Sequence, residues 1–170
     1  MKKLTLALAL CGAALALSAQ SSFQNAVGLR LGYPVSASYK HFLDDANAIE
    51  AYAGFRGNTF YNFFNIAGAY QRHYSFGIAD PDLAPLNWYW GAGASVYFFT
   101  YDLGGSGFVD NDFASTTFGL NGYIGLQYAF EGVPLELTLD WVPSIFVGNT
   151  FFSAFGAGYG GLGARYILGR

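Results

Sequence analysis

The sequence predicts an all-β chain that folds as an eight-stranded antiparallel up-and-down barrel spanning a membrane. First, beyond an N-terminal leader, apolar residues alternate with polar or small ones in eight segments separated by turn residues. Second, the chain is 53% hydrophobic and 19% aromatic but only 11% charged, where about 25% charged is usual in soluble domains. Third, no apolar run beyond the leader suits a membrane helix, and the remaining spanning structure is a closed β-barrel.

The leader, residues 1–19, has the three parts of a secretory signal peptide. Lys2 and Lys3 precede a mostly apolar run, and small residues end near Ala19, where we expect cleavage, with Ser18 as the alternative. Residues 20–170 are then expected to form a single barrel domain. Acidic residues outnumber basic ones, 11 to 8, which argues against binding to nucleic acid.

The first three predicted strands place charged or small residues between alternating apolar ones. These strands are 26–33, 35–42 and 49–56. Folding the second onto the third about Asp45 places Lys40 opposite Glu50 on the polar face.

The next three predicted strands are longer and rich in aromatic residues. They are 61–74, 88–99 and 118–130, and the fourth alternates least cleanly. The sixth is the clearest, because its aromatic and aliphatic residues face away from a row of glycine, asparagine and glutamine.

The last two predicted strands are 133–141, with the sequence "VPLELTLDW", and 155–168. Folding the sixth strand onto the seventh about 131–134 pairs Leu126 with Leu139 on one face. The same register pairs Gln127 with Thr138 on the other face, so no face is mixed. All five prolines, Pro143 included, are expected between strands or at their ends, where a missing backbone donor does least harm.

The polar side of the strands collects four bases and three acids among small residues. Inside a narrow barrel, each buried charge needs a partner. We therefore expect a packed interior network in which Lys40 pairs with Glu50 and Glu136 pairs with Arg165. The expected members are Arg30, Lys40, Glu50, Arg56, Glu136, Asp140 and Arg165.

The apolar side fits the dimensions of a bilayer. Ten residues separate Trp88 from Phe98, which corresponds to roughly 25 Å along the axis of a barrel with strands tilted by about 40°. Aromatic residues near the strand ends are expected at the membrane interfaces. These residues are Trp88, Trp90, Phe98, Tyr128, Phe130, Trp141 and Tyr166.

The leader, the eight strands, the charged interior and the hairpin "GLNGYIGLQYAFEGVPLELTLDW" together resemble the small outer-membrane β-barrel proteins of Gram-negative bacteria, of the OmpA/OmpX type. The resemblance implies an integral outer-membrane location, both termini in the periplasm, surrounding lipids as partners and a monomeric state. It also places the segments near 57–61, 104–115 and 148–153 outside the cell, where they could contact a surface ligand or envelope protein. The chain departs from the pattern at its end, "YILGR", where these barrels usually carry an aromatic residue.

We expect a non-enzymatic protein without cofactor or metal. A general diffusion pore is not expected either, because the interior of an eight-stranded barrel is just wide enough for side chains. One alternative is a lipid-modifying enzyme, since "HYS" resembles the His-x-Ser pair of the small barrel lipid A deacylases. His73 and Ser75 would share a face of a strand, although they lie toward the periplasmic rim. The other alternative is a soluble lipocalin-like carrier, which requires the leucine face to turn inward. His41 is expected at the interface, as is His73 when it is not catalytic, and two separated histidines make no metal site.

Overall fold

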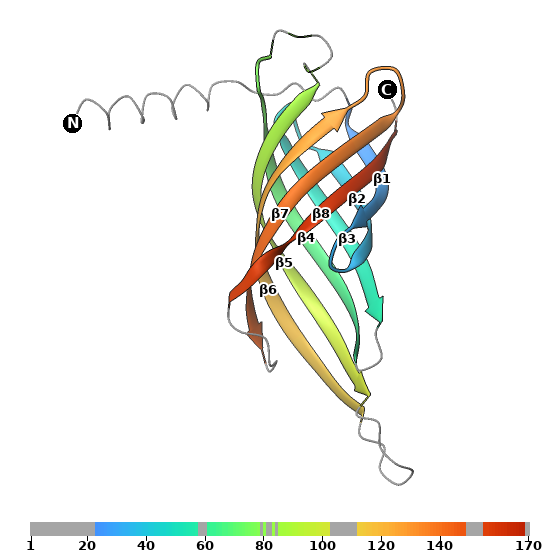
Figure 1. Ribbon diagram of the computed structural model, residues 1–170, viewed down its shortest axis with the longest axis vertical. Helices are drawn as coiled ribbons and strands as arrows, with labels where there is room; N and C mark the ends of the chain where they lie inside the picture. The colour runs from blue at the N-terminus through green and yellow to red at the C-terminus, as the bar shows by residue number, and fades with distance from the viewer. Residues whose placement is uncertain are drawn as a thin grey trace, which may run out of the picture.

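The computed structural model describes residues 23–57, 61–78, 80, 83, 85–102, 112–148 and 155–168. The expected signal peptide, 1–19, and most of the expected outer loops lie outside these residues. Within them, eight antiparallel strands follow one another around a closed barrel (Figure 1). The strands are β1 (Asn25–Leu31), β2 (Val35–Phe42), β3 (Asn47–Gly57), β4 (Tyr61–Ser75), β5 (Leu86–Asp102), β6 (Asp112–Ala129), β7 (Leu135–Gly148) and β8 (Phe155–Leu168).

The predicted strand pairing is confirmed. β6 and β7 pair Leu126 with Leu139 and Gln127 with Thr138, and β2 and β3 pair Lys40 with Glu50. β1 pairs with β8 and closes the barrel. The β2–β3 and β6–β7 registers keep apolar residues on one face and polar or small residues on the other, which is why the sequence alone could specify them.

β7 continues beyond the predicted end at Trp141. It passes through Pro143 to Gly148, with a register shift in its pairing to β8 between Val142 and Ser144. A proline can lie inside a strand where a bulge removes the need for its missing N–H donor. The expectation that every proline bounds a strand is therefore wrong at Pro143, and Trp141 lies in the middle of its strand.

The two faces of the barrel invert the usual distribution of a soluble protein. Leu139 is 57% exposed on the outer face, whereas its neighbour Asp140 is 5% exposed inside. Because side chains of successive strand residues point to opposite faces, the same contrast repeats around the barrel. Among the described residues, the structure contains no helix long and apolar enough to span a membrane.

The strands are unequal in length, so the barrel wall is uneven. β1 has 7 residues and β2 has 8, whereas β5 has 17 and β6 has 18. Every strand has one end on the side of the barrel where β1 begins and β8 ends, and the β5–β6 hairpin therefore reaches furthest toward the opposite end, at the bottom of Figure 1. We call this opposite end the far end.

The interior side chains form four successive layers from the termini to the far end. Along β3 alone, Ala48, Glu50 and Tyr52 belong to the first three. The terminal plug comprises Phe23, Ala26, Phe42, Ala48, Ala129 and Ile167. The charged layer comprises Arg30, Lys40, Glu50, Glu136, Asp140 and Arg165. The tyrosine layer comprises Tyr52, Tyr123 and Tyr159. The aromatic cup comprises Tyr33, Phe63, Tyr97, Phe99 and Phe146.

Candidate functional site

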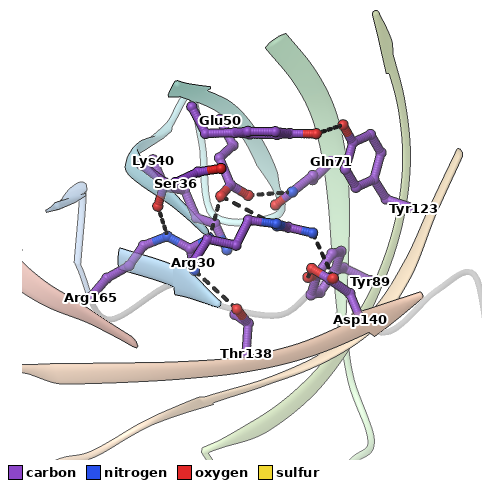
Figure 2. Close-up of polar contacts among 12 residues, drawn as sticks. Arg30, Ser36, Lys40, Glu50, Gln71, Tyr89, Tyr123, Thr138, Asp140 and Arg165 are labelled. Atoms are coloured by element: carbon purple, nitrogen blue, oxygen red, sulfur yellow. Dashed lines mark hydrogen bonds and ion pairs between the residues drawn. The ribbon is translucent and has the colours of Figure 1, made fainter. Parts of the chain in front are cut away.

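The charged layer is the most unusual feature of the interior, because three bases and three acids lie there at 5% exposure or less. Their formal charges balance, which limits the electrostatic cost of removing them from water. They come from β1, β2, β3, β7 and β8, and their side chains meet across the lumen (Figure 2).

Glu50 lies at the centre of the charged layer. Its Oε1 accepts a short hydrogen bond from Nη2 of Arg165 and lies 3.5 Å from Nη1 of Arg30. Its Oε2 accepts a hydrogen bond of 2.7 Å from Nε2 of Gln71. One carboxylate therefore neutralises parts of two guanidinium groups, and both of its oxygens are hydrogen-bonded.

Arg30 crosses the lumen from Glu50 to Asp140, as Figure 2 shows. Nη2 of Arg30 donates to Oδ1 of Asp140 at 2.6 Å, and the hydroxyl of Tyr89 donates to the other oxygen of Asp140 at 2.6 Å. The guanidinium also lies 5.1 Å from the ring centroid of Tyr52, a cation–π contact that couples the charged layer to the tyrosine layer.

Glu136, the third acid of the charged layer, forms ion pairs with two cations. Nζ of Lys40 lies 2.7 Å from Oε1 of Glu136, and Nη1 of Arg165 lies 3.4 Å from the same oxygen. The predicted pair of Glu136 with Arg165 is confirmed. The predicted ion pair of Lys40 with Glu50 is wrong although the two residues face each other in register, because Arg165 and Gln71 occupy the oxygens of Glu50 and Lys40 reaches across to Glu136.

Glycine makes room for these long side chains. A Cβ atom added at Gly161 would lie 2.7 Å from Oδ1 of Asp140 and 3.1 Å from Nη2 of Arg30. Any larger residue there would collide with the ion pair itself. The row of glycines on β8 therefore forms part of the charged layer.

Arg56, the seventh residue expected in the network, does not belong to it. It lies on the inward side of β3 opposite Phe63, but β2 begins at Val35 opposite Phe55 and covers no residue beyond it. Arg56 is consequently exposed, and its guanidinium lies 4.1 Å from the ring centroid of Tyr33. The sequence could not show this, because face assignment by alternation ignores where the neighbouring strand stops.

His73 and Ser75 are not hydrogen-bonded to each other. His73 is 1% exposed, between the rings of Phe42 and Tyr89, and neither ring nitrogen has a hydrogen-bond partner among the described residues. The hydroxyl of Ser75 instead accepts a hydrogen bond from the amide of Gly77. The expectation of an interfacial His73 is also wrong, because its side chain points into the packed lumen. His41 is partly buried and hydrogen-bonded to Asn25.

The seven aromatic residues expected at membrane interfaces lie on the outward positions of their strands or directly after them. Trp90, Phe98, Trp141 and Tyr166 are 44% to 57% exposed. Trp88 stacks on Tyr74 with ring centroids 4.7 Å apart, and Tyr128 packs edge to face on Phe130. Their depth in a bilayer remains a prediction. In the part of the chain that the structure describes, no cluster of three or more His, Cys, Asp or Glu residues could hold a metal.

The aromatic cup is the part of the interior that sequence reasoning missed. Its rings come from the β1–β2 connection and from β4, β5 and β7, and they contact one another at centroid distances of 5.2 Å to 6.0 Å. A signal existed, since Tyr97 and Phe99 continue the inward face of β5 that begins with Tyr89. Aromatic residues on both faces of β4 and β5 obscured it.

Comparison with known proteins supports the fold. No protein-family model matches the chain, and no curated protein matches it. The crystal structure of the N-terminal β-barrel domain of Pseudomonas aeruginosa OprF has a TM-score of 0.55 and 16% sequence identity, over 85% of this chain and 95% of that domain. Neisserial surface protein A has a TM-score of 0.48 and 21% identity, over 85% of this chain and 93% of its own. The chain thus has the fold of the OprF N-terminal domain, an all-β closed barrel of eight antiparallel strands.

Proposed function

We propose that this protein is an integral outer-membrane barrel without enzymatic activity, exported through cleavage of residues 1–19. Its packed interior makes it a structural or surface-interaction protein rather than a pore, and its far end carries the contact surface. The observation that carries the proposal is the inversion of the barrel: hydrocarbon outside and neutralised charge inside.

The outer face supports a lipid surrounding. Leu29, Leu120 and Val147 are 56%, 60% and 61% exposed, and similar residues cover every strand. In water, an apolar surface of this extent is an aggregation hazard. In a bilayer, it contacts acyl chains instead, and a closed barrel leaves no unpaired strand edge in the hydrocarbon.

The interior argues against the two alternatives. A soluble lipocalin-like carrier needs the leucine face inside, whereas Leu126 and Leu139 point outward and their neighbours Gln127 and Asp140 point inward. A deacylase needs a histidine that activates its serine, whereas His73 lies between two rings with its nitrogens unbonded to any described residue.

Spin labelling tests the proposed membrane position. Nitroxides at Leu126 and Leu139 of the protein reconstituted in phospholipid vesicles should relax with oxygen rather than with a water-soluble nickel complex, because both positions face the acyl chains. A nitroxide at Gly132, in the β6–β7 turn, is the matched control and should be accessible to nickel. Nickel accessibility at Leu126 and Leu139, or recovery of the wild type in the soluble periplasm, would contradict the proposal.

A further inference from the structure

A small apolar cavity lies at the far end of the barrel, between the aromatic cup, Thr117 and Tyr159. Its volume is about 50 Å³. Rings from several elements form its wall, with Phe63 and Phe99 5.2 Å apart between their centroids and Tyr97 set edge to face against Phe146. Polar solutes would lose their hydration here without replacement, so the wall suits hydrocarbon.

The tyrosine layer closes the cavity on the side that faces the charged layer. The hydroxyl of Tyr52 lies 2.6 Å from that of Tyr123 and 3.4 Å from that of Tyr159. Arg30 lies on the other side of these hydroxyl groups from the cavity, 5.8 Å from the ring centroid of Tyr123 and bonded to Asp140. The cavity is therefore blind: a molecule that enters from the far end cannot pass through the barrel.

The positively charged side chain of Arg56 lies at the rim of the cavity. Arg56 lies opposite Phe63 in the β3–β4 register, and its guanidinium covers the ring of Tyr33, another member of the cup. It is exposed and has no acidic partner within the described part of the chain. Its N–H groups can thus receive a carboxylate, for which the planar guanidinium is well shaped.

We propose that the aromatic cup binds a linear alkyl carboxylate, a fatty acid anion, with the end of its chain in the cavity and its carboxylate on Arg56. The cavity is about 50 Å³, about a third of the 150 Å³ of an engineered cavity that accepts benzene. A methylene chain, which is narrower than a ring, therefore fits the cavity best. This inference goes beyond the membrane proposal, because it depends on the cup and its rim.

Binding of decanoate to the folded protein in phosphatidylcholine nanodiscs tests the site. Nuclear Overhauser effects from the terminal methyl group to aromatic ring protons should appear, with saturable binding beyond that of empty nanodiscs. Arg56→Gln should weaken decanoate binding by about tenfold or more, as expected for a lost hydrogen bond between charged groups. Binding of decanol, which lacks the charge, should remain unchanged.

Two neighbouring threonines on β6 provide a matched pair of variants. Thr117→Phe fills the cavity and should abolish binding of both probes, whereas Thr116→Phe on the outer face should leave binding intact. Heat-modifiable mobility in gels verifies that each variant folds. If Thr117→Phe does not fold, the test rests on Arg56→Gln, which lies at the exposed rim. The proposal is overturned if decanoate binds Arg56→Gln as tightly as wild type, or if folded Thr117→Phe still gives the ring contacts.

Discussion

The charged layer and the aromatic cup share one barrel but are enclosed differently. All eight strands pass the charged layer, so its six ionic residues are buried and bonded from several sides. At the cup, the short strands β1 and β2 have ended, and Tyr33 and Phe146 are only half-buried. The difference shows that strand length, and not residue type alone, decides whether an inward position seals the barrel or remains accessible.

The largest effect is expected for Glu50→Ala, which removes the carboxylate shared by Arg30 and Arg165. Two buried guanidinium groups would lose a partner, and breaking a buried ion pair from one side costs about 3–5 kcal/mol. The free energy of unfolding, measured by urea titration of the protein in detergent micelles, should fall by that amount. Asp45→Ala, in the exposed β2–β3 turn, is the control and should change the free energy by less than about 0.5 kcal/mol.

The cup provides the counterpart to this experiment. Phe146→Ala removes a half-buried ring, so it should lose only part of the transfer free energy of a side chain, about 1–2 kcal/mol. A loss equal to that of Glu50→Ala would break the comparison, because it would show that the rim of the barrel is as closed as its middle.

An effect of similar size to that of Phe146→Ala should distinguish the inner face of the barrel wall from its outer face. Gly161→Ala places a Cβ atom 2.7 Å from Oδ1 of Asp140, and overpacking of this kind costs about 1–3 kcal/mol. Gly68→Ala is the matched control, since a Cβ atom there meets nothing within 4 Å. The same unfolding measurement should show a loss for Gly161→Ala alone, and equal stabilities would mean that the ion pair can shift at little cost.

The sequence predicted the parts of this molecule that depend on alternation. Strand number, the β6–β7 register and the contact of Glu136 with Arg165 all follow from keeping apolar and polar faces separate. Contacts between residues on strands that are not neighbours could not be predicted from the sequence. Lys40 forms its ion pair with Glu136 across the lumen and not with Glu50 on the neighbouring strand. The alternation of residues along a strand does not indicate which of two acids on the same inner face a lysine contacts.

The strand ends show the same limit. Pro143 signals a boundary in sequence but lies at a bulge within β7. Arg56 has the parity of an interior residue but lies beyond the covering strand. The cup escaped notice because rings occupy both faces of β4 and β5 near their far ends, and alternation in hydrophobicity vanishes where both faces are aromatic.

The smallest expected effect concerns an acid outside the barrel, which sharpens the contrast with the buried acids. In the β2–β3 turn, the side chain of Asn47 and the amides of Ala46 and Asn47 donate to the carboxylate of Asp44 and hold its pKa below the usual value. The ionised form is thus favoured in the folded state, so its stabilisation is present above about pH 4 and is lost as the pH falls through the lowered pKa. Carboxyl ¹³C NMR should show Asp44 titrating below the usual pKa of an aspartate, and Asn47→Ala should raise the pKa of Asp44 while leaving the barrel folded. Titration of Asp44 at or above the usual value would contradict this, and would mean that the turn does not hold its carboxylate as the interior holds Glu50.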